Sequence, residues 1–550
     1  MNALAVLYGG SLAQEAFENI FAGKNAVNLA LEKAARFPGV TGIVLLLSGA
    51  LPDGFRPEAE SAGAVPVKLV YQDSWTRKSL LKTISASAES YDQTYFAWAD
   101  CPLLDPALAG RILDRHVKYA AEYSYADGWP YGLAPELLAP GTAGILAKIL
   151  GDGGGEPVER NAVFSVLQKD INAFDIETEI SPIDLRSHRL SLCADSKRNL
   201  LLLSRFFEAF NAEAHPLSAD GASPSVAGIS ALTEKIITER PGLLRTLPAF
   251  YPVQVAGPCL QACTFCPYPV FGAVNGVPVT ERTDFMDPLH FSALLDSIVA
   301  FSGDAVIDLS LWGEISLHPQ KTELIRQALA RPELCLIIET SGLGWKNAEL
   351  EEIVTMAAAA PKRKNPLLPR SPLSWIVSLD AFDSGLYREI RGAGFSEAVE
   401  TAKKLLTLFP GNTYVQAVRT AGAEDDIEKF YRFWKDESVK AESVNENSVI
   451  IQKYDDFCGF LPKKQASDLS PVRRQSCWHL MREIPVLIDG TVPLCRETLG
   501  GTWAGTSPAG NAFTESLELI WERQGNFYRN CCGDYPPICA ECDEYYTYNF

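Results

Sequence analysis

GPCLQACTFCPYP, residues 257–269, places Cys259, Cys263 and Cys266 in a C-x3-C-x2-C spacing. In a chain with this share of cysteine, chance would produce the spacing only about 0.007 times. A structural zinc site normally closes with four ligands, and no fourth cysteine or histidine lies near these three. Three thiolates on a four-iron cluster would leave one iron open, as a catalytic metal site does for its substrate. We therefore favour an iron–sulfur site, with zinc or unligated buried thiols as the alternative.

The sequence that follows the triplet alternates between strand-like and helix-like segments. Apolar strands are predicted at 305–311, 334–339, 375–379 and 414–419, with helical periodicity between them. Repeated strand and helix units without obvious antiparallel hairpins predict a barrel or part of one, whose chemistry lies at the carboxyl ends of its strands. After about Ser470 the helical pattern fades and cysteines become frequent, which predicts a small domain held by metal.

Residues 251–434 resemble the radical SAM superfamily, whose signature is this cysteine triplet after the first barrel strand. In that family a 4Fe-4S cluster leaves one iron open, and this iron chelates the amino and carboxylate groups of S-adenosylmethionine. One electron, from a donor such as flavodoxin or ferredoxin, then cleaves the sulfonium to methionine and a 5′-deoxyadenosyl radical. The resemblance implies that Cys259, Cys263 and Cys266 hold this cluster.

Further motifs follow the triplet in the family's order. The resemblance implies that Phe265 lies near the adenine and that Gly313 and Glu314, after Trp312 in place of a family glycine, receive the methionine amino group. ETSG at 339–342 resembles the family's third-strand motif, and SLD at 378–380 resembles the segment that contacts the ribose. The expected contacts to the cofactor come from Ser378 and Asp380, which alternate onto one face of a strand, and from Arg391, whose guanidinium can bind a carboxylate. Taken singly, each of these residues has an ordinary alternative in the core or on the surface.

The last 74 residues contain six more cysteines, and their pattern resembles the SPASM domain of radical SAM proteins. That domain carries auxiliary iron–sulfur clusters. The resemblance implies one auxiliary 4Fe-4S cluster of the reduced, twitch-like type. Its expected ligands are Cys477, Cys495, Cys539 and Cys542, with Cys531 or Cys532 as substitute or spare ligands. A zinc knob is the alternative. The other cysteines, which stand alone in the sequence, are Cys101, Cys193, Cys335 and Cys458.

The N-terminal part has the alternating strand and helix pattern of a doubly wound sheet. AVLYGG at 5–10 and WADCPLLD at 98–105 resemble nucleotidyltransferases of the sugar-nucleotide and molybdopterin type. The resemblance implies a glycine loop for a nucleotide triphosphate and a magnesium ion on Asp100. The loop lacks its expected basic residue, and only Lys24 offers a distant substitute. Nucleotidyl transfer, nucleotide or nucleotide-sugar binding without chemistry, and a structural role all remain open.

The charge and hydropathy of the chain limit its partners. Lys and Arg number 49 against 68 Asp and Glu, which gives a net charge of −19 and would repel nucleic acid. The longest apolar stretches fall far short of the ~20 residues that a membrane-spanning helix needs. No basic segment precedes the first apolar residues. We expect no nucleic-acid partner, no membrane association and a cytoplasmic location, where cysteines stay reduced or bind metal.

The sequence therefore predicts an α/β chain in four parts. These are a doubly wound, nucleotidyltransferase-like domain over 1–210, a linker over 211–245, a radical SAM partial (β/α)6 TIM-type barrel over 246–465, and a small, cysteine-rich SPASM/twitch-like domain over 466–550.

The architecture resembles the group known as spiro-SPASM proteins. It implies a radical SAM enzyme that removes hydrogen from a peptide or protein. The alternatives are a radical dehydrogenase of a sugar or nucleotide-sugar, a nucleotidyltransferase with an iron–sulfur redox or scaffold domain, and a binding module. The sequence assigns no catalytic acid, base or nucleophile.

Overall fold

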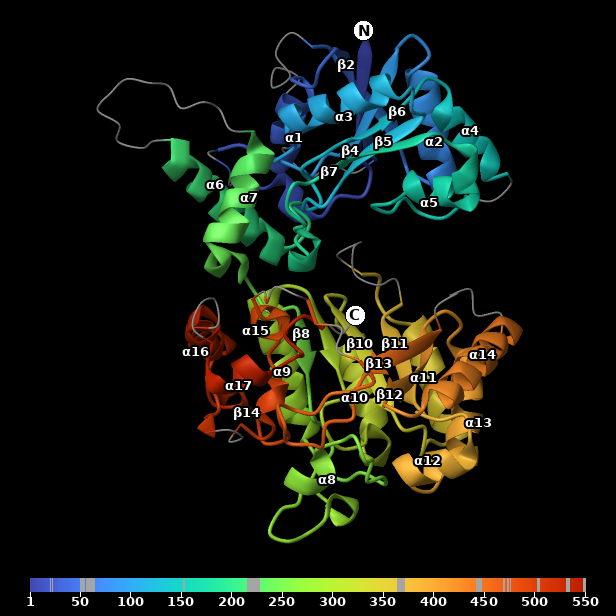
Figure 1. Cartoon of the computed structure of the whole chain (residues 1–550), viewed down its shortest axis with the longest axis vertical. Coiled ribbons are helices and arrows are strands. Elements are labelled where there is room, and N and C mark those ends of the chain that lie inside the picture. The colour runs from blue at the N-terminus through green and yellow to red at the C-terminus, as the bar shows by residue number, and fades with distance from the viewer. Residues whose placement is uncertain are drawn as a thin grey trace. The chain divides into compact units, whose positions relative to one another are not determined.

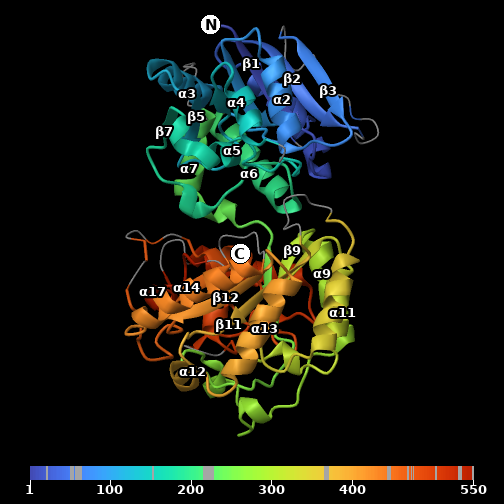
Figure 2. The same ribbon diagram turned by 90° about the vertical axis from the view of Figure 1, so that its right-hand side faces the viewer.

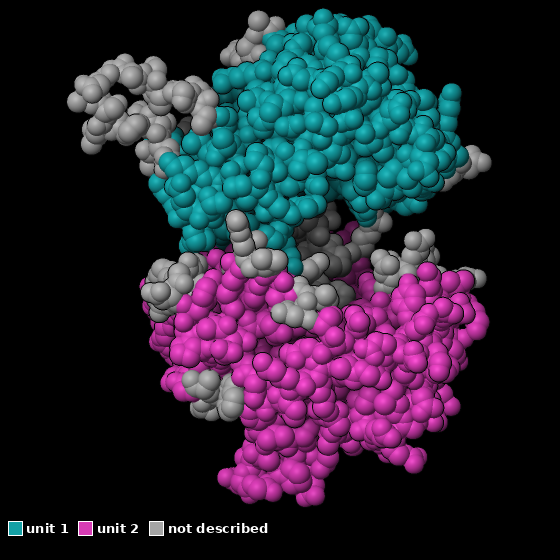
Figure 3. Space-filling view, in the orientation of Figure 1, with its two compact units in different colours: residues 1–244 teal, residues 245–550 magenta. Residues whose placement is uncertain are grey.

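A computed structural model of the chain divides into two compact units, Met1–Leu244 (unit 1) and Arg245–Phe550 (unit 2), which Figure 3 shows in separate colours. The structure describes all residues except 20, 22, 50–54, 56–64, 152–153, 215–227, 364–370, 442–447, 468–469, 472–473, 475, 502–504, 531–534 and 548–550.

Unit 1 is built on a seven-stranded sheet with the order β3-β2-β1-β4-β6-β5-β7. Its strands are β1 (Ala3–Gly9), β2 (Val40–Ser48), β3 (Val67–Gln72), β4 (Gln93–Trp98), β5 (Tyr123–Asp127), β6 (Glu136–Leu138) and β7 (Ile176–Ile180). Strand β1 is parallel to β2 and β4, whereas β6 runs antiparallel to β4 and β5. Every residue of β1 is buried, as expected for a central strand with both faces covered.

The helices of unit 1 alternate with these strands, which confirms the predicted α/β class (Figure 1). They are η1 (Gln14–Phe17), α1 (Ala26–Ala34), α2 (Arg77–Ser87), α3 (Pro106–Lys118), α4 (Thr142–Ile149), α5 (Phe164–Leu167), η3 (Gln168–Ala173), η4 (Arg186–His188), α6 (Lys197–Ala214), α7 (Ile229–Glu239) and η5 (Pro241–Leu244). The stretch 211–245, expected to be a linker, thus contains the end of α6 and all of α7.

Unit 2 contains a six-stranded sheet in which the strands lie in chain order, from β8 to β13. They are β8 (Phe250–Pro252), β9 (Ala305–Asp308), β10 (Leu334–Thr340), β11 (Leu373–Ser378), β12 (Thr413–Arg419) and β13 (Val449–Lys453). All neighbouring pairs are parallel, so the sheet forms a half-barrel whose strands end at one common edge.

Helices connect these strands, since parallel neighbours need crossover connections (Figures 1 and 2). They are α8 (Tyr268–Phe271), η6 (Val279–Glu281), α9 (Pro288–Ser302), η7 (Ile315–Leu317), α10 (Lys321–Leu329), α11 (Asn347–Ala358), α12 (Ser384–Ile390), α13 (Phe395–Leu408) and α14 (Glu424–Lys440). Figure 1 shows α8 and α12 at the same end of unit 2.

The C-terminal segment of unit 2 packs on the same core as the half-barrel. It contains α15 (Trp478–Arg482), β14 (Thr491–Val492), η8 (Arg496–Thr498), β15 (Gly510–Asn511), α16 (Leu517–Asn530) and α17 (Pro537–Glu541). Val486 and Ile520 are fully buried in the cluster that also holds Trp375 of β11 and Leu294 of α9. Burial of this size is the main force that holds the segment in place.

None of the helices in the described ranges combines the length and the apolar character that crossing a bilayer requires.

Candidate functional site

A cavity of about 220 Å³ lies at the carboxyl edge of the half-barrel sheet. Each of the six strands contributes a residue at or next to its carboxyl end: Pro252, Asp308, Thr340, Ser378, Val418 and Lys453. Parallel half-barrels carry their chemistry at this edge because the loops that follow the strands meet there.

All three cysteines of the triplet line this cavity. Their loop follows β8 and is fixed by backbone hydrogen bonds from Cys266 N to Cys263 O (3.1 Å) and from Cys259 N to Val279 O (3.1 Å). Burial, helped by the carboxylate of Glu314, raises the pKa of Cys259 to about 12. Burial also raises the pKa of Cys266, and the thiols of Cys263 and Cys259 raise it further. Thiols gathered in this way need a bound cation to become thiolates.

The separation of the three sulfur atoms bears on whether they would hold a cluster or a single ion. A tetrahedral zinc ion, with Zn–S near 2.3 Å, holds its thiolates roughly 3.8 Å apart. Within the described part of the chain, only two sets of metal-ligating atoms lie within 4.8 Å of one another, Asp100/Cys101/Cys193 and Asp455/Asp543/Glu544. The three sulfur atoms of the triplet thus do not all lie within 4.8 Å of one another, and their all-thiol donor set fits a multi-iron cluster.

The loop over Trp312, Gly313 and Glu314 lies against the triplet loop. Gly313 has φ of +74°, and a Cβ there would lie 1.9 Å from the Ala256 carbonyl oxygen, so only glycine fits. Glu314 N donates to Pro258 O (2.9 Å). These contacts hold the backbone of the loop at the cavity wall.

The carboxylate of Glu314 already accepts four hydrogen bonds inside the protein. The donors are the Thr340 hydroxyl (2.7 Å), the Ser341 backbone N–H and hydroxyl (2.8 and 2.7 Å), and Ser316 N (3.2 Å). A carboxylate has about four acceptor sites. Glu314 thus ties its loop to the end of β10. The methionine amino group that the resemblance assigns to Glu314 would have to share a carboxylate that is already hydrogen-bonded.

Ser378 and Asp380 occupy different environments. Ser378 lines the cavity and donates to Glu339 Oε1 (2.7 Å). Strand β11 ends at Ser378, and Asp380 adopts φ of +65°, so the expected alternation onto one face does not continue. Asp380 is instead buried in an ion pair with Arg391 and accepts from Val418 N (2.7 Å).

Arg391 lines the cavity and is held from two sides. Asp380 pairs with its guanidinium, and its Nε donates to Gln261 Oε1 (2.8 Å). The Phe265 ring, which also lines the cavity, lies 5.9 Å from the guanidinium carbon. The structure therefore brings Phe265 and Arg391 together beside the triplet, with a cationic group available for an anion.

Several cavity residues were not identified from the sequence. Asp308 is 5% exposed; its Oδ2 accepts from Ser310, while its Oδ1 has no hydrogen-bond partner among the described residues. Burial raises the pKa of Asp308 to about 8. Lys453 and Arg496 add positive charge to the same wall. Two of these residues could have been found from their place in the sequence, because Asp308 and Lys453 are each the last residue of a strand, at the carboxyl edge of the sheet.

The four C-terminal cysteines gather in one place, beside this wall. Burial, the carboxylate of Glu497 and the thiols of Cys477, Cys542 and Cys539 raise the pKa of Cys495. Among the described residues, none of these thiols belongs to a three-ligand group within 4.8 Å. Cys531 and Cys532, expected as spare ligands, lie outside the described residues.

Cys458, which stands alone in the sequence, lies near this group in the fold. The neighbouring thiol of Cys542, burial and the thiol of Cys495 together raise the pKa of Cys458. His479 is not a free ligand, because its Nδ1 pairs with Glu483 (2.8 Å) and its Nε2 with the Glu544 carbonyl (3.0 Å).

The magnesium site expected around Asp100 in unit 1 contains a positively charged side chain, that of Arg160. Arg160 donates to both carboxylate oxygens of Asp100 (2.7 and 2.5 Å) and to Asp195 (3.1 Å), and its guanidinium lies 4.1 Å from the Trp98 ring centre. The distant substitute cation, Lys24, is paired with Glu32. A magnesium ion on Asp100 does not fit this arrangement, because a guanidinium already occupies the carboxylate.

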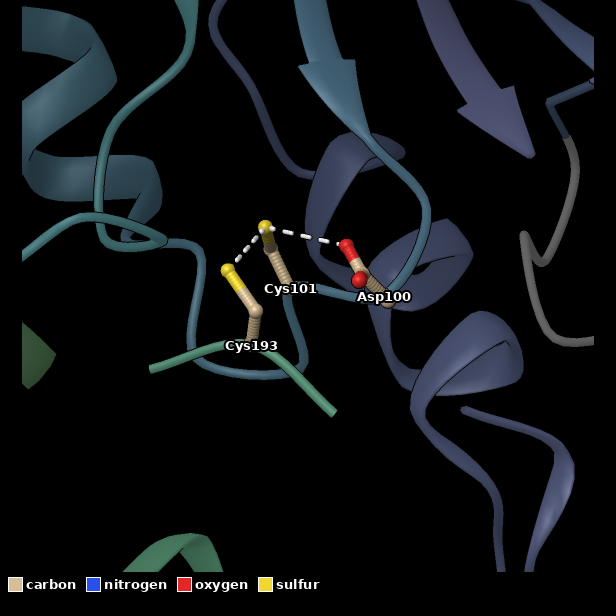
Figure 4. Close-up of side chains that lie close together, drawn as sticks. All are labelled: Asp100, Cys101 and Cys193. Carbon is tan, nitrogen blue, oxygen red and sulfur yellow. Dashed lines mark hydrogen bonds between the residues drawn. The ribbon is translucent and has the colours of Figure 1, made fainter. Parts of the chain in front are cut away.

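Cys101 and Cys193, isolated in the sequence, lie together beside Asp100 (Figure 4). Their sulfur atoms are 3.6 Å apart, and the Cys101 thiol points to Asp100 Oδ1 at 3.7 Å. The hydrogen bond with Cys193 and burial raise the pKa of Cys101 well above its usual value. Among the described residues this set offers three ligands, one short of a closed structural zinc site.

No protein-family model matches the chain. The chain is 33% identical over 396 residues to an uncharacterized protein of Treponema pallidum (strain Nichols), and the match covers 70% of this chain and 98% of that protein. A second uncharacterized protein of the same organism is 38% identical over 64 residues, which is 12% of this chain and 29% of that protein.

Solved structures resemble the chain more distantly. Streptococcus suis SuiB bound to precursor peptide SuiA is 14% identical, with 57% of this chain and 74% of that chain covered and a TM-score of 0.38. BtrN in complex with AdoMet and 2-DOIA is 16% identical, with 52% and 87% covered and a TM-score of 0.32. A cytidylyltransferase from Leptospira borgpetersenii is 17% identical, with 44% and 95% covered and a TM-score of 0.34.

Proposed function

This chain belongs to the same family as the Treponema pallidum (strain Nichols) protein that it matches over 98% of that protein's length, and we propose that it is a radical SAM iron–sulfur enzyme. The proposed reaction is reductive cleavage of S-adenosylmethionine followed by removal of a hydrogen atom from a substrate in the half-barrel cavity. One observation carries the proposal: the three thiols of the triplet line a cavity at the carboxyl edge of a parallel sheet.

The chain's residues would bind and orient the cofactor. Cys259, Cys263 and Cys266 would ligate the 4Fe-4S cluster, which together with S-adenosylmethionine supplies a 5′-deoxyadenosyl radical when bound. Arg391, fixed by Asp380 and Gln261, offers a guanidinium at the cavity wall for the methionine carboxylate.

Two aromatic side chains, packed against a third, form a second wall that would keep water from a reactive species. Trp312 stacks on Tyr268 with ring centres 6.0 Å apart and contacts Phe271 at 5.0 Å. Both Trp312 and Tyr268 line the cavity. Exclusion of water protects a radical from side reactions, and here the protein's part is shielding rather than chemistry.

For the substrate we propose a peptide or protein. The far wall combines carboxyl groups of Asp308, Glu339 and Asp455 with the cations of Lys453 and Arg496. Side chains of both signs suit a ligand that presents both donors and acceptors, as a peptide does. A sugar or nucleotide-sugar oxidised by the same radical chemistry is the alternative, since hydroxyl groups would satisfy the same wall.

The C-terminal thiols would hold an auxiliary 4Fe-4S cluster on Cys477, Cys495, Cys539 and Cys542. A flavodoxin or ferredoxin is the proposed electron donor. The nucleotidyltransferase alternative has less support, because the guanidinium of Arg160 already pairs with both carboxylate oxygens of Asp100.

Anaerobic turnover tests the proposal. The chain reconstituted with iron and sulfide is incubated with S-adenosylmethionine and dithionite, and 5′-deoxyadenosine is measured by liquid chromatography. We expect formation by the natural chain and by Cys335→Ala, which removes a buried thiol of β10 that does not line the cavity. Cys263→Ala should reduce formation to background. Equal formation by Cys263→Ala would overturn the proposal.

A further inference from the structure

The carboxyl ends of the half-barrel strands place a row of polar side chains on one face of the sheet. Ile337 of β10 is the register partner of Asp308 of β9, and Glu339 follows Ile337 by two positions. Side chains two positions apart in a strand point to the same face, and both Asp308 and Glu339 line the cavity. Ser378 of β11 and its register partner Gln416 of β12 continue the row along the cavity wall.

Asp308 and Glu339 each offer one carboxylate oxygen to the cavity. Asp308 is 5% exposed; its Oδ2 accepts from the Ser310 hydroxyl, and its Oδ1 has no hydrogen-bond partner among the described residues. The hydrogen bonds that Glu339 accepts from described residues, from Ser378 (2.7 Å) and Gln416 (2.9 Å), both go to Oε1. Since buried acceptors are nearly always satisfied, the two remaining oxygens indicate a position for a hydrogen-bond donor of a ligand.

The positive charges of the cavity wall are already balanced inside the protein. Every cation among the described lining residues is paired with a carboxylate: Arg391 with Asp380, Lys453 with Asp543 and Glu544, and Arg496 with Asp455 and Glu497. Neither Asp308 nor Glu339 forms an ion pair with any residue that the structure describes. Buried charges are normally paired, so these two carboxyl groups favour a ligand group that is itself positive.

The electrostatics of Asp308 agree with a cationic ligand. Burial raises its pKa to about 8, and the carboxylates of Glu339 and Glu483 raise it further, although the Ser310 hydroxyl and Arg496 oppose the shift. A positive group bound beside Asp308 would stabilise the ionised carboxylate and reverse the shift.

The free oxygens also select the kind of cation. A guanidinium binds a carboxylate best through both of its oxygens, and Oδ2 of Asp308 and Oε1 of Glu339 are already occupied. An ammonium group has three N–H donors that point in separate directions, so it can donate to one oxygen of each carboxyl group.

We propose that the substrate presents a primary ammonium group, which donates to Asp308 Oδ1 and Glu339 Oε2. A lysine side chain of a peptide and an amino sugar both carry this group, and they correspond to the two substrate classes proposed above. The inference rests on the proposed function only in taking this cavity as the substrate site.

Binding of two matched pairs of probes tests the inference. The pairs are a capped tripeptide with a central lysine against its norleucine counterpart, and glucosamine against glucose. Isothermal titration calorimetry is performed on the reconstituted chain with S-adenosylmethionine, at about 0.15 M salt to screen exposed charges. We expect the ammonium member of at least one pair to bind about 10- to 100-fold more tightly than its counterpart. The pair that shows the preference identifies the source of the ammonium group.

Three variants locate the preference. Asp308→Asn should abolish it and keep S-adenosylmethionine binding, because the side chain keeps its size and loses its charge. Glu339→Gln keeps an oxygen for Ser378 and Gln416 and should weaken the preference. Asp304→Asn is the control, since Asp304 is buried just before β9, at the amino end of that strand, and does not line the cavity. It should bind as the natural chain does.

Equal binding within both pairs, or binding of none of the probes, would overturn the inference. A preference that persists in Asp308→Asn would overturn it too. Formation of 5′-deoxyadenosine judges the proposed function separately. A natural chain that cleaves S-adenosylmethionine and shows no preference for the ammonium probes would therefore contradict the inference alone.

Discussion

At the residue scale, Arg160 determines what unit 1 can bind. Its guanidinium joins Asp100 to Asp195 in a buried ion triad, and the carboxylates are 1% and 3% exposed. Removing one partner of such a group leaves buried charge without compensation, which typically costs about 3–5 kcal/mol. The guanidinium fills the place in which the sequence predicts a metal ion.

Arg160→Gln should therefore destabilise unit 1 by about 3–5 kcal/mol. Hydrogen exchange of β4, measured by mass spectrometry, reports this loss locally. Millimolar Mg²⁺ should restore part of the protection in the variant, because the two freed carboxylates can then bind a cation, and should leave the natural chain unchanged. Protection of β4 that is equal in both proteins would contradict the assignment.

Glu136 on β6 gives unit 1 a pH dependence. Burial raises its pKa to about 7, although the Tyr123 hydroxyl donates to it at 2.8 Å and lowers it. The folded state therefore holds this proton more tightly than the unfolded state. The contribution to stability is full below about pH 4.5 and is lost as the pH rises to about 7.

The natural chain should lose stability between pH 5 and 7, by at most about 1.4 kcal/mol for each pH unit from this group. Glu136→Gln keeps a neutral acceptor for Tyr123 and should flatten the profile. Urea denaturation followed through the hydrogen exchange of β6 measures both slopes. Parallel profiles for the two proteins would exclude Glu136 as the source.

At the scale of elements, the loop after β9 depends on one glycine. Gly313→Ala forces a Cβ against the Ala256 carbonyl and adds the cost of a positive φ. Gly411→Ala is a matched control, since φ there is +75° and no atom lies within 4 Å of the added Cβ.

We expect Gly411→Ala to cost about 1 kcal/mol and to keep S-adenosylmethionine binding. Gly313→Ala should cost more and weaken binding at least tenfold, measured by equilibrium dialysis on the reconstituted protein, because the loop must move away from the triplet. Equal affinities in the two variants would show that this loop does not form the cofactor site.

Four of the six half-barrel strands, β9 to β12, were predictable because buried parallel strands are continuous apolar runs. The predicted 334–339 and 414–419 correspond to β10 (Leu334–Thr340) and β12 (Thr413–Arg419). The predicted 305–311 was too long, since β9 ends at Asp308 and the chain then turns, with positive φ at Trp312 and Gly313.

Side-chain roles that depend on the fold were harder to predict. Asp380 departs from strand alternation because its φ is +65°, which no sequence pattern indicates. Cys458 lies 19 positions before Cys477, outside any motif spacing, and only the fold of unit 2 brings it near Cys542. Arg160 was missed because its carboxylate partners lie 60 and 35 positions away in the chain.

At the scale of the whole molecule, metal should stabilise one unit and not the other. The thiols of both proposed clusters belong to unit 2, and several have raised pKa values that a bound cation would reverse. Unit 1 holds neither cluster.

Iron removal by an anaerobic chelator should therefore increase hydrogen exchange around 255–270 and 477–495, and should leave β1 and β4 unchanged. Exchange measured before and after chelation gives both results in one experiment. Reconstitution with iron and sulfide should reverse the change. Equal loosening of both units would contradict a metal requirement confined to unit 2.

The proposed binding of S-adenosylmethionine to an open iron of the cluster is most directly tested by electron–nuclear double resonance on the reduced, reconstituted chain. For this experiment S-adenosylmethionine is labelled at its amino nitrogen and carboxylate oxygen. We predict hyperfine coupling of both labels to a cluster iron. The coupling should persist in Cys477→Ala, which removes an auxiliary thiol, and disappear in Cys263→Ala. Absence of coupling in a natural chain that holds its full iron would contradict the proposed function.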